Sequence, residues 1–127
     1  MDEPRNCVLL VDDNADFRRS LHKIFEQAGW EVCGEAENGV DAIEKAERLQ
    51  PRIIVLDLVM PKMNGLTAAR VLKRTMPNVH LILFTMHGTL LTADDTVSAG
   101  IDAVFSKDEP ITALLEKAQR LLTPEVA

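Results

Sequence analysis

The stretch from Ile53 to Gly65 constrains the fold more than any other part of the chain. Four apolar residues, three of them β-branched, lead directly into Asp57, and Pro61 and Gly65 follow as loop signals. A short, uninterrupted apolar run is typical of a strand that is covered on both faces, as in a parallel sheet. Ligands of open parallel sheets bind at the carboxyl ends of the strands, so Asp57 is expected at such a site. Because an isolated buried charge is costly, Asp57 needs a partner there.

The rest of the chain alternates between apolar runs and amphipathic segments. Strands are predicted at 7–11, 30–36, 53–56, 79–84 and 102–105, and helices at 17–28, 40–48, 66–75, 90–99 and 110–122. The helix over 40–48 should turn Val40, Ile43 and Ala46 inward, and the helix over 90–99 has a weak propensity. This alternation predicts an α/β fold of the flavodoxin-like type: a doubly wound parallel sheet of five strands in the order 2-1-3-4-5, with five helices on both faces.

Length and composition indicate one domain over residues 1–127, with its core at 6–122 and a tail or the start of a linker at 123–127. The formal charge of −6 argues against direct nucleic-acid binding by this domain, because phosphate contacts need clustered basic residues. The sequence shows neither a long apolar run nor a signal peptide at its start, so we expect a cytoplasmic protein without a membrane span. Cys7 and Cys33 lack metal or redox spacing and are expected to be buried, reduced thiols.

Polar residues follow four of the predicted strands: Asp12 and Asp13, Asp57, Thr85, and Lys107. A parallel sheet would bring them to one edge. Two carboxylates 4 Å apart repel each other by about 4 kcal/mol at an effective dielectric constant near 20, so the cluster needs a cation. Oxygen ligands favour Mg²⁺, with Mn²⁺ as an alternative. One aspartate could then attack phosphorus as a nucleophile, while Lys107 and Thr85 bind the phosphoryl oxygens.

These residues carry a family resemblance. Asp12 and Asp13, Asp57 with Met60, Pro61 and Gly65, Thr85, and Phe105 with Lys107 resemble, in order and spacing, the receiver domain of bacterial two-component response regulators. The resemblance spans nearly the whole chain. It implies that Asp57 accepts a phosphoryl group from a histidine kinase or a histidine phosphotransfer protein. It also implies a regulatory domain that catalyses only its own phosphorylation and dephosphorylation.

The resemblance further implies roles for individual residues. Mg²⁺ would be held by Asp13, Asp57 and the backbone carbonyl of Val59, with Asp12 acting partly through water. Thr85 and Phe105 would form the switch that changes the output face, which consists of the fourth helix, the fifth strand and the fifth helix. Two further sets of residues are named as candidates, namely Arg18 and His22 for kinase contacts, and Met86 and His87 for tuning the lifetime of the phosphorylated state.

Residues 85–87 and 106–108 are most similar to the NarL/FixJ-type receivers, a subgroup that usually carries a C-terminal helix-turn-helix. Control of transcription through a DNA-binding domain outside this chain is therefore expected, with a phosphorylation-dependent homodimer as one form. The alternative is a stand-alone receiver that acts by protein–protein contact or as a phosphorelay intermediate. A flavodoxin-like cofactor binder and an aspartate phosphatase are weaker rivals. The acidic pair would repel a cofactor phosphate, and Val59 stands where such phosphatases carry a second aspartate.

Overall fold

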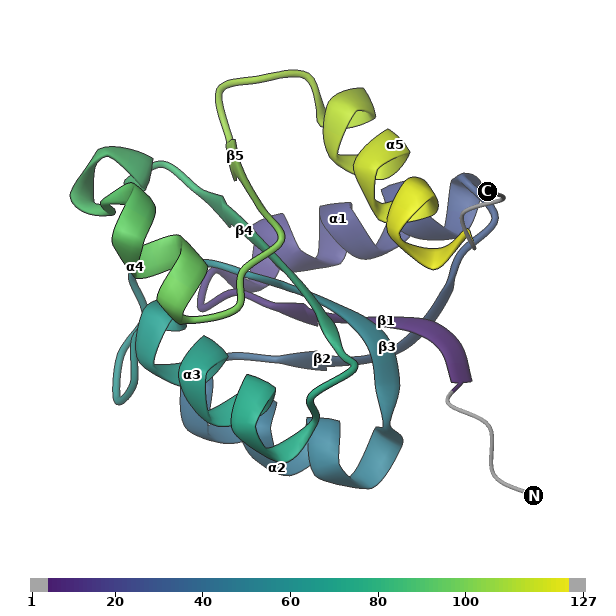
Figure 1. The fold of residues 1–127 in the computed structure, drawn as a ribbon. Coiled ribbons are helices and arrows are strands. Elements are labelled where there is room, and N and C mark those ends of the chain that lie inside the picture. The colour runs from purple at the N-terminus through teal and green to yellow at the C-terminus, as the bar shows by residue number, and fades with distance from the viewer. Residues whose placement is uncertain (1–4, 124–127) are drawn as a thin grey trace.

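The computed structural model describes residues 5–123, with side chains from Cys7 onward. It contains a parallel sheet of five strands in the order β2-β1-β3-β4-β5, as the sequence predicts (Figure 1). The elements are β1 (Arg5–Val11), α1 (Ala15–Gln27), β2 (Glu31–Ala36), α2 (Gly39–Leu49), β3 (Pro51–Leu56), α3 (Gly65–Thr75), β4 (His80–Thr85), the 3₁₀ turn η1 (Gly88–Leu90), α4 (Ala93–Ser98), β5 (Ala103–Ser106) and α5 (Ile111–Leu122). Of the predicted tail or linker, residues 124–127 lie outside the described part of the chain.

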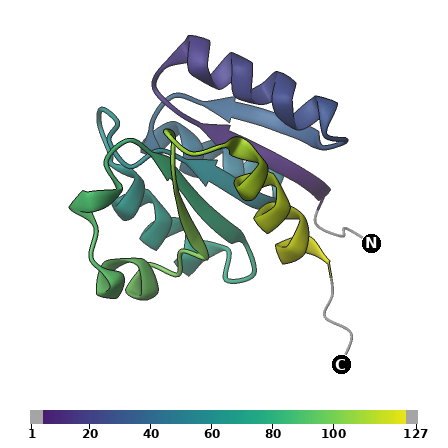
Figure 2. The same ribbon diagram turned by 90° about the horizontal axis from the view of Figure 1, so that it is seen from above.

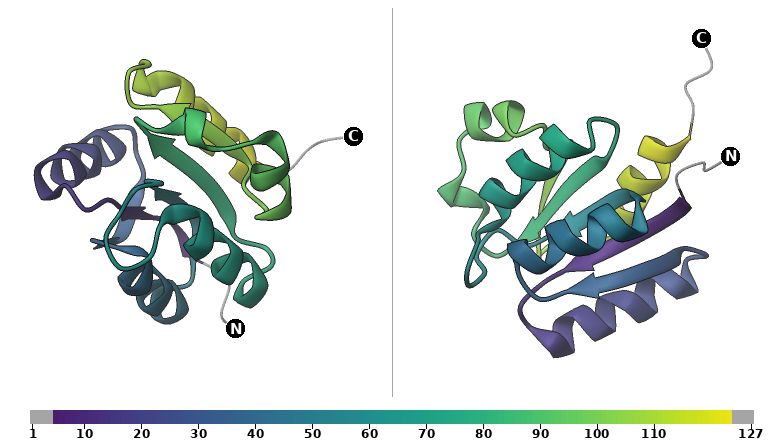
Figure 3. Two further views of the ribbon diagram at one scale, coloured as in Figure 1. Left: turned by 90° about the vertical axis from the view of Figure 1, so that its left-hand side faces the viewer. Right: turned by 90° about the horizontal axis from the view of Figure 1, so that it is seen from below.

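Helices cover both faces of the sheet (Figures 2 and 3), and each face has its own apolar core. Alternation along β1 divides the two cores, because successive side chains of a strand point to opposite faces. Val8 and Leu10 pack with α1 and α5, whereas Leu9 and Val11 pack with α2 and α3. All four side chains are buried. The sheet is therefore packed on both faces up to the end of β1, where Asp12 and Asp13 follow.

Asparagine caps fix the starts of the helices that follow three of the strands. Asn14, Asn38 and Asn64 each accept a hydrogen bond from the backbone N–H three residues further on, which satisfies a donor that a helix start leaves free. Gly65, the first residue of α3, packs against the backbone that follows β3. A Cβ atom built there would lie 2.1 Å from the carbonyl oxygen of Asp57, so only glycine fits this position.

Two local predictions differ from the structure. The weak helix predicted over 90–99 is split into η1 and the short α4, which begins only at Ala93 after a capping box at Thr92 and Asp95. Ala46 is buried and Ile43 packs against the core as predicted, but the early position of Val40 in α2 leaves its side chain 40% exposed, and Ala42 is buried in addition. The Lys107–Asp108 peptide bond is trans, since no peptide bond among residues 5–123 is cis.

Cys7 and Cys33 form a disulfide between β1 and β2, so the expectation of two reduced thiols is wrong for this structure. Their Cα atoms lie 5.5 Å apart, within the range that a disulfide spans without backbone movement. The pairing of β1 with β2 is irregular at this point: Val8 pairs with Val32, but Leu9 pairs with Gly34, which leaves Cys33 as an extra residue on β2. The expectation of reduced thiols failed because the spacing of two cysteines in a sequence does not reveal how the strands that carry them pair.

Candidate functional site

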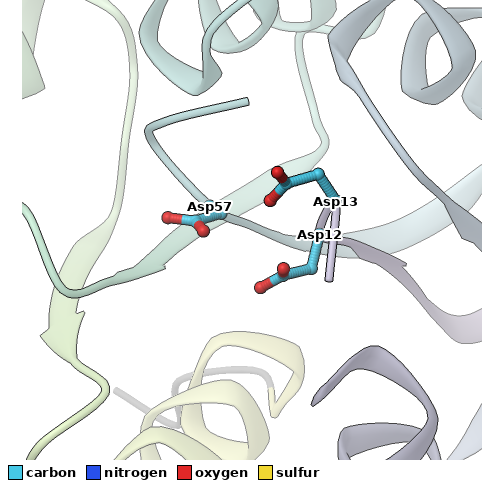
Figure 4. Close-up of side chains that lie close together, drawn as sticks. All are labelled: Asp12, Asp13 and Asp57. Atoms are coloured by element: carbon cyan, nitrogen blue, oxygen red, sulfur yellow. The ribbon is translucent and has the colours of Figure 1, made fainter. Parts of the chain in front are cut away.

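Three aspartates meet at the carboxyl end of the sheet, where β1 and β3 lie side by side. Val11 pairs with Leu56, and the N–H of Asp57 donates to the carbonyl of Val11 at 3.1 Å. This register brings the residues after each strand together. Carboxylate oxygens of Asp12, Asp13 and Asp57 lie within 4.8 Å of one another (Figure 4).

Lys107 enters this cluster from the loop after β5. Its Nζ atom lies 2.7 Å from Oδ2 of Asp12 and 3.0 Å from Oδ2 of Asp57, so one ammonium bridges two carboxylates. The same atom lies 4.2 Å from the centroid of the Phe17 ring, a cation–π distance. Phe17 also packs against the core, and no pattern in the sequence pointed to its contact with Lys107.

Burial and pairing act together on the charges of the site. Burial raises the pKa of Asp12, and the hydrogen bonds from Lys107 and the Asn14 N–H offset this effect only in part. Burial alone would lower the pKa of Lys107, but its hydrogen bonds to Asp12 and Asp57 outweigh that effect and raise the pKa above its ordinary value. Lys107 is therefore a cation at neutral pH, whereas the carboxylates are short of counter-charge.

The donor set suits a divalent cation. Three carboxylates against one ammonium leave a formal charge of −2 (−3 + 1) at one end of the sheet. Asp12 and Asp57 are only 3% and 7% exposed, whereas Asp13 is exposed, so a cation would be reachable from one side and held from the other. Oxygen ligands that leave room for water are what Mg²⁺ takes. The residues present therefore fit this metal ion.

Comparison with known proteins identifies the family. The model of the response regulator receiver domain matches residues 8–119. The chain belongs to this family. A receiver domain is a regulatory phosphoacceptor module of two-component signalling. The chain is 40% identical to the chemotaxis protein CheY of Thermotoga maritima over 73% of its length and 78% of that protein. It is also similar to the CheY of Bacillus subtilis, with 31% identity over 91% of this chain and 96% of that one.

Other relatives of this receiver domain are longer proteins. A protein-glutamate methylesterase/protein-glutamine glutaminase of Archaeoglobus fulgidus is 38% identical over 91% of this chain, which spans only 34% of that relative. Among solved structures, the response regulator TrrA of Thermotoga maritima in complex with Mg²⁺-BeF has a TM-score of 0.85 at 26% identity, with 93% of this chain and all of that chain covered. These matches support the receiver fold and leave the output open.

The predicted switch residues of the receiver domain lie on neighbouring strands, Thr85 at the end of β4 and Phe105 on β5. Thr85 is fully buried, and its hydroxyl oxygen accepts a hydrogen bond from the N–H of His87 at 3.0 Å. Phe105 is half-buried and packs against the core between the sheet and helices α1 and α5. Met86 is 54% exposed, and Val59 is 46% exposed in the loop after Asp57.

The two candidate kinase contacts are turned toward the protein itself. Arg18 and His22, both on α1, bond to the carboxylate of Glu35 on β2, at 2.7 and 2.6 Å. Their side chains are 17% and 29% exposed. The expectation of kinase contacts stays a prediction. Sequence analysis missed Glu35, because the pairing of β1 with β2 is what brings it over α1.

No helix among the described residues is both long and apolar enough to cross a bilayer.

Proposed function

We propose that Asp57 accepts a phosphoryl group from a histidine kinase or a histidine phosphotransfer protein in a reaction that needs Mg²⁺ or Mn²⁺. One observation carries this proposal: Asp12, Asp13 and Asp57 converge while Lys107 bridges two of them. A carboxylate oxygen of Asp57 forms the new P–O bond as the P–N bond of the donor breaks. Asp12, Asp13, Asp57 and the carbonyl of Val59 would hold the metal ion, which neutralises the phosphoryl oxygens. Lys107 supplies a positive charge that already lies 3.0 Å from the acceptor.

The phosphorylated state would then alter the surface formed by α4, β5 and α5. Thr85 hydrogen-bonds to the backbone of His87, so a movement of its hydroxyl toward the phosphoryl group releases the start of η1. Phe105 lies on β5, where it pairs with Phe84, next to Thr85 on β4. Apolar side chains on this surface and on the adjoining η1 support a partner or a second copy: Leu90 on η1, Val97 on α4 and Val104 on β5 are 67%, 79% and 37% exposed.

Two outputs have support from different observations. Similarity to a LuxR-family two-component response regulator from Aurantimonas, with a TM-score of 0.83 and 25% identity over 91% of this chain and 83% of that one, favours a NarL/FixJ-type receiver. Such a receiver would regulate transcription through a DNA-binding domain. Coverage of nearly the whole Bacillus CheY favours a stand-alone receiver or phosphorelay intermediate. In either case we place the protein in the cytoplasm, where a kinase would meet it.

The direct test uses a small-molecule phosphodonor and Mg²⁺. We expect intact-protein mass spectrometry to show the gain of one phosphoryl group, which peptide mapping assigns to Asp57. The gain should vanish when EDTA removes the metal ion. A mass gain that survives EDTA, or that maps to another residue, would contradict the proposal.

Met86 should slow loss of the phosphoryl group. Its exposed side chain follows Thr85 directly and can exclude water from the phosphorylated Asp57. We expect Met86→Ala to dephosphorylate several-fold faster, measured from the decay of the mass gain after the donor is removed. Val97→Ala, which shortens an equally apolar side chain on α4, is the matched control and should decay as the unsubstituted protein does. His87→Ala tests the second predicted tuning residue in the same assay.

Lys107 should matter more for the response than for folding. Lys107→Ala removes the ammonium that would follow the phosphoryl oxygens, while β5 keeps its pairing with β4. We expect the variant to gain the phosphoryl group but to show little change in amide hydrogen exchange over η1 and α4. Urea unfolding of both proteins, measured in parallel, checks that the sheet is intact. A full exchange response in Lys107→Ala would show that Lys107 does not transmit the change.

A further inference from the structure

Arg18 connects the acidic cluster to a second charged group. Its Nη1 atom donates to the main-chain carbonyl of Asp12 at 2.5 Å, and its Nε atom donates to Oε1 of Glu35 at 2.7 Å. The side chain is 17% exposed, so solvent competes little for these bonds. One guanidinium is thus bonded both to the backbone of the site and to the side chain of a residue on β2.

Glu35 is itself held from several directions. Its second carboxylate oxygen lies 2.6 Å from Nδ1 of His22, and its backbone carbonyl accepts from Nζ of Lys45 at 2.5 Å. Burial would raise the pKa of Glu35, but the hydrogen bonds from His22 and Arg18 outweigh it and lower the pKa. Glu35 is therefore an anion that holds Arg18 in one orientation.

The bond from Arg18 to the carbonyl of Asp12 matters because the Asp13 carboxylate has only the backbone to position it among the described residues. The N–H of Asp12 donates to the carbonyl of Ala36 at 3.0 Å, and the carbonyl of Asp12 accepts from Arg18. Both polar groups of the Asp12 backbone are thus fixed. By contrast, Asp13 is exposed, and no described residue donates a hydrogen bond to its carboxylate. The orientation of the Asp12–Asp13 peptide bond fixes the position of the Asp13 Cα atom, from which that carboxylate extends.

We infer that Arg18 is a positioning residue for the metal site, with Glu35 as the group that orients it. Arg18 holds the Asp12–Asp13 peptide so that the Asp13 carboxylate faces Asp57. The inference rests on the proposed function, because the ion that these carboxylates would bind is the one that phosphorylation needs. Groups that orient the ligands of a metal ion typically change metal affinity by about 10- to 100-fold when they are removed.

Charge and position predict opposite results for the removal of Arg18. If Arg18 acted only through its positive charge, it would repel the metal ion, and Arg18→Ala would tighten metal binding. If Arg18 instead positions the Asp12–Asp13 peptide, Arg18→Ala frees that peptide and weakens metal binding. The direction of the change in affinity therefore separates the two roles.

The experiment measures the dissociation constant of Mg²⁺ by calorimetric titration, without a phosphodonor. We expect Arg18→Ala to weaken binding by about 10-fold. Arg18→Lys keeps the charge but lacks the planar fork that reaches two partners, so it should also bind more weakly than the unsubstituted protein. Arg19→Ala is the matched control, because Arg19 is 66% exposed and contacts only Asp16 among the described residues. Its affinity should be unchanged or slightly higher.

A merely structural role would give a different pattern. If Arg18 only fastens α1 to β2, both Arg18 variants should lose stability in urea while their Mg²⁺ affinity stays that of the unsubstituted protein. That pattern, or tighter binding by Arg18→Ala, would overturn the inference. Should Arg18→Ala fail to fold, Arg18→Lys decides alone: affinity equal to that of the unsubstituted protein would overturn it. Failure of the unsubstituted protein to bind Mg²⁺ or to gain a phosphoryl group would instead refute the proposed function.

Discussion

Asp57→Asn should abolish the phosphoryl mass gain while leaving the fold intact. An asparagine side chain has nearly the same shape as aspartate, but its neutral amide is a poor nucleophile and a weaker metal ligand. Lys107 keeps its 2.7 Å contact with Asp12, so the ammonium is not left without a partner. Intact-protein mass spectrometry after treatment with a small-molecule phosphodonor and Mg²⁺ measures the loss.

Urea unfolding of Asp57→Asn shows whether a missing mass gain reflects the loss of the acceptor group or the loss of the fold. The variant has one carboxylate fewer in a cluster of net negative charge, so its urea midpoint without metal should equal or exceed that of the unsubstituted protein. Saturating Mg²⁺ should stabilise the unsubstituted protein, by about 2.7 kcal/mol at 100 times the dissociation constant, and the variant less. Asp16→Asn is the matched control, since this acid is 95% exposed at the start of α1. A mass gain in Asp57→Asn equal to that of the control would place the acceptor elsewhere.

The sequence predicts the sheet and the gathering of its acids for one physical reason. Uninterrupted apolar runs indicate strands buried on both faces, and parallel strands bring their carboxyl ends to one edge. The residues that follow the apolar runs are therefore expected to converge, and this can be predicted without knowing any side-chain conformation. They are Asp12, Asp13, Asp57 and Lys107. The strand order 2-1-3-4-5 was taken from the common orders of doubly wound sheets, and the structure confirms it.

Contacts that depend on register or on side-chain direction were beyond the sequence. The bond of Arg18 to Glu35 needs the pairing of β1 with β2, and its bond to the carbonyl of Asp12 needs one particular side-chain direction. Thr85 shows the same limit: its place at the end of β4 was predicted, but its full burial and its bond to His87 were not. The predicted helix over 90–99 is split because the capping box of Thr92 and Asp95 starts α4 at Ala93, within a segment of low helix propensity.

Reduction of the Cys7–Cys33 disulfide should lower the free energy of unfolding by about 3.5 kcal/mol at 25 °C. This value follows from the sequence separation of 26 residues in the chain-entropy account, in which the crosslink restricts the unfolded chain. Urea unfolding with and without reductant measures it. Cys33→Ser is the informative variant, because Cys33 is half-buried whereas Cys7 lies in the core. The variant should match the reduced protein and show no response to reductant.

Thiol titration of the unfolded, unreduced protein provides an independent check. The chain has only two cysteines, so the crosslinked protein should contain no reactive thiol. Two reactive thiols, together with equal stability in urea with and without reductant, would mean that the disulfide does not form in solution. Phosphorylation should be the same in the oxidised and reduced protein, because Cys7 lies four residues before Val11, where β1 ends and the acidic cluster begins. Since a cytoplasm keeps most thiols reduced, the reduced form is the one in which the receiver would signal there, with the lower stability that this prediction gives it.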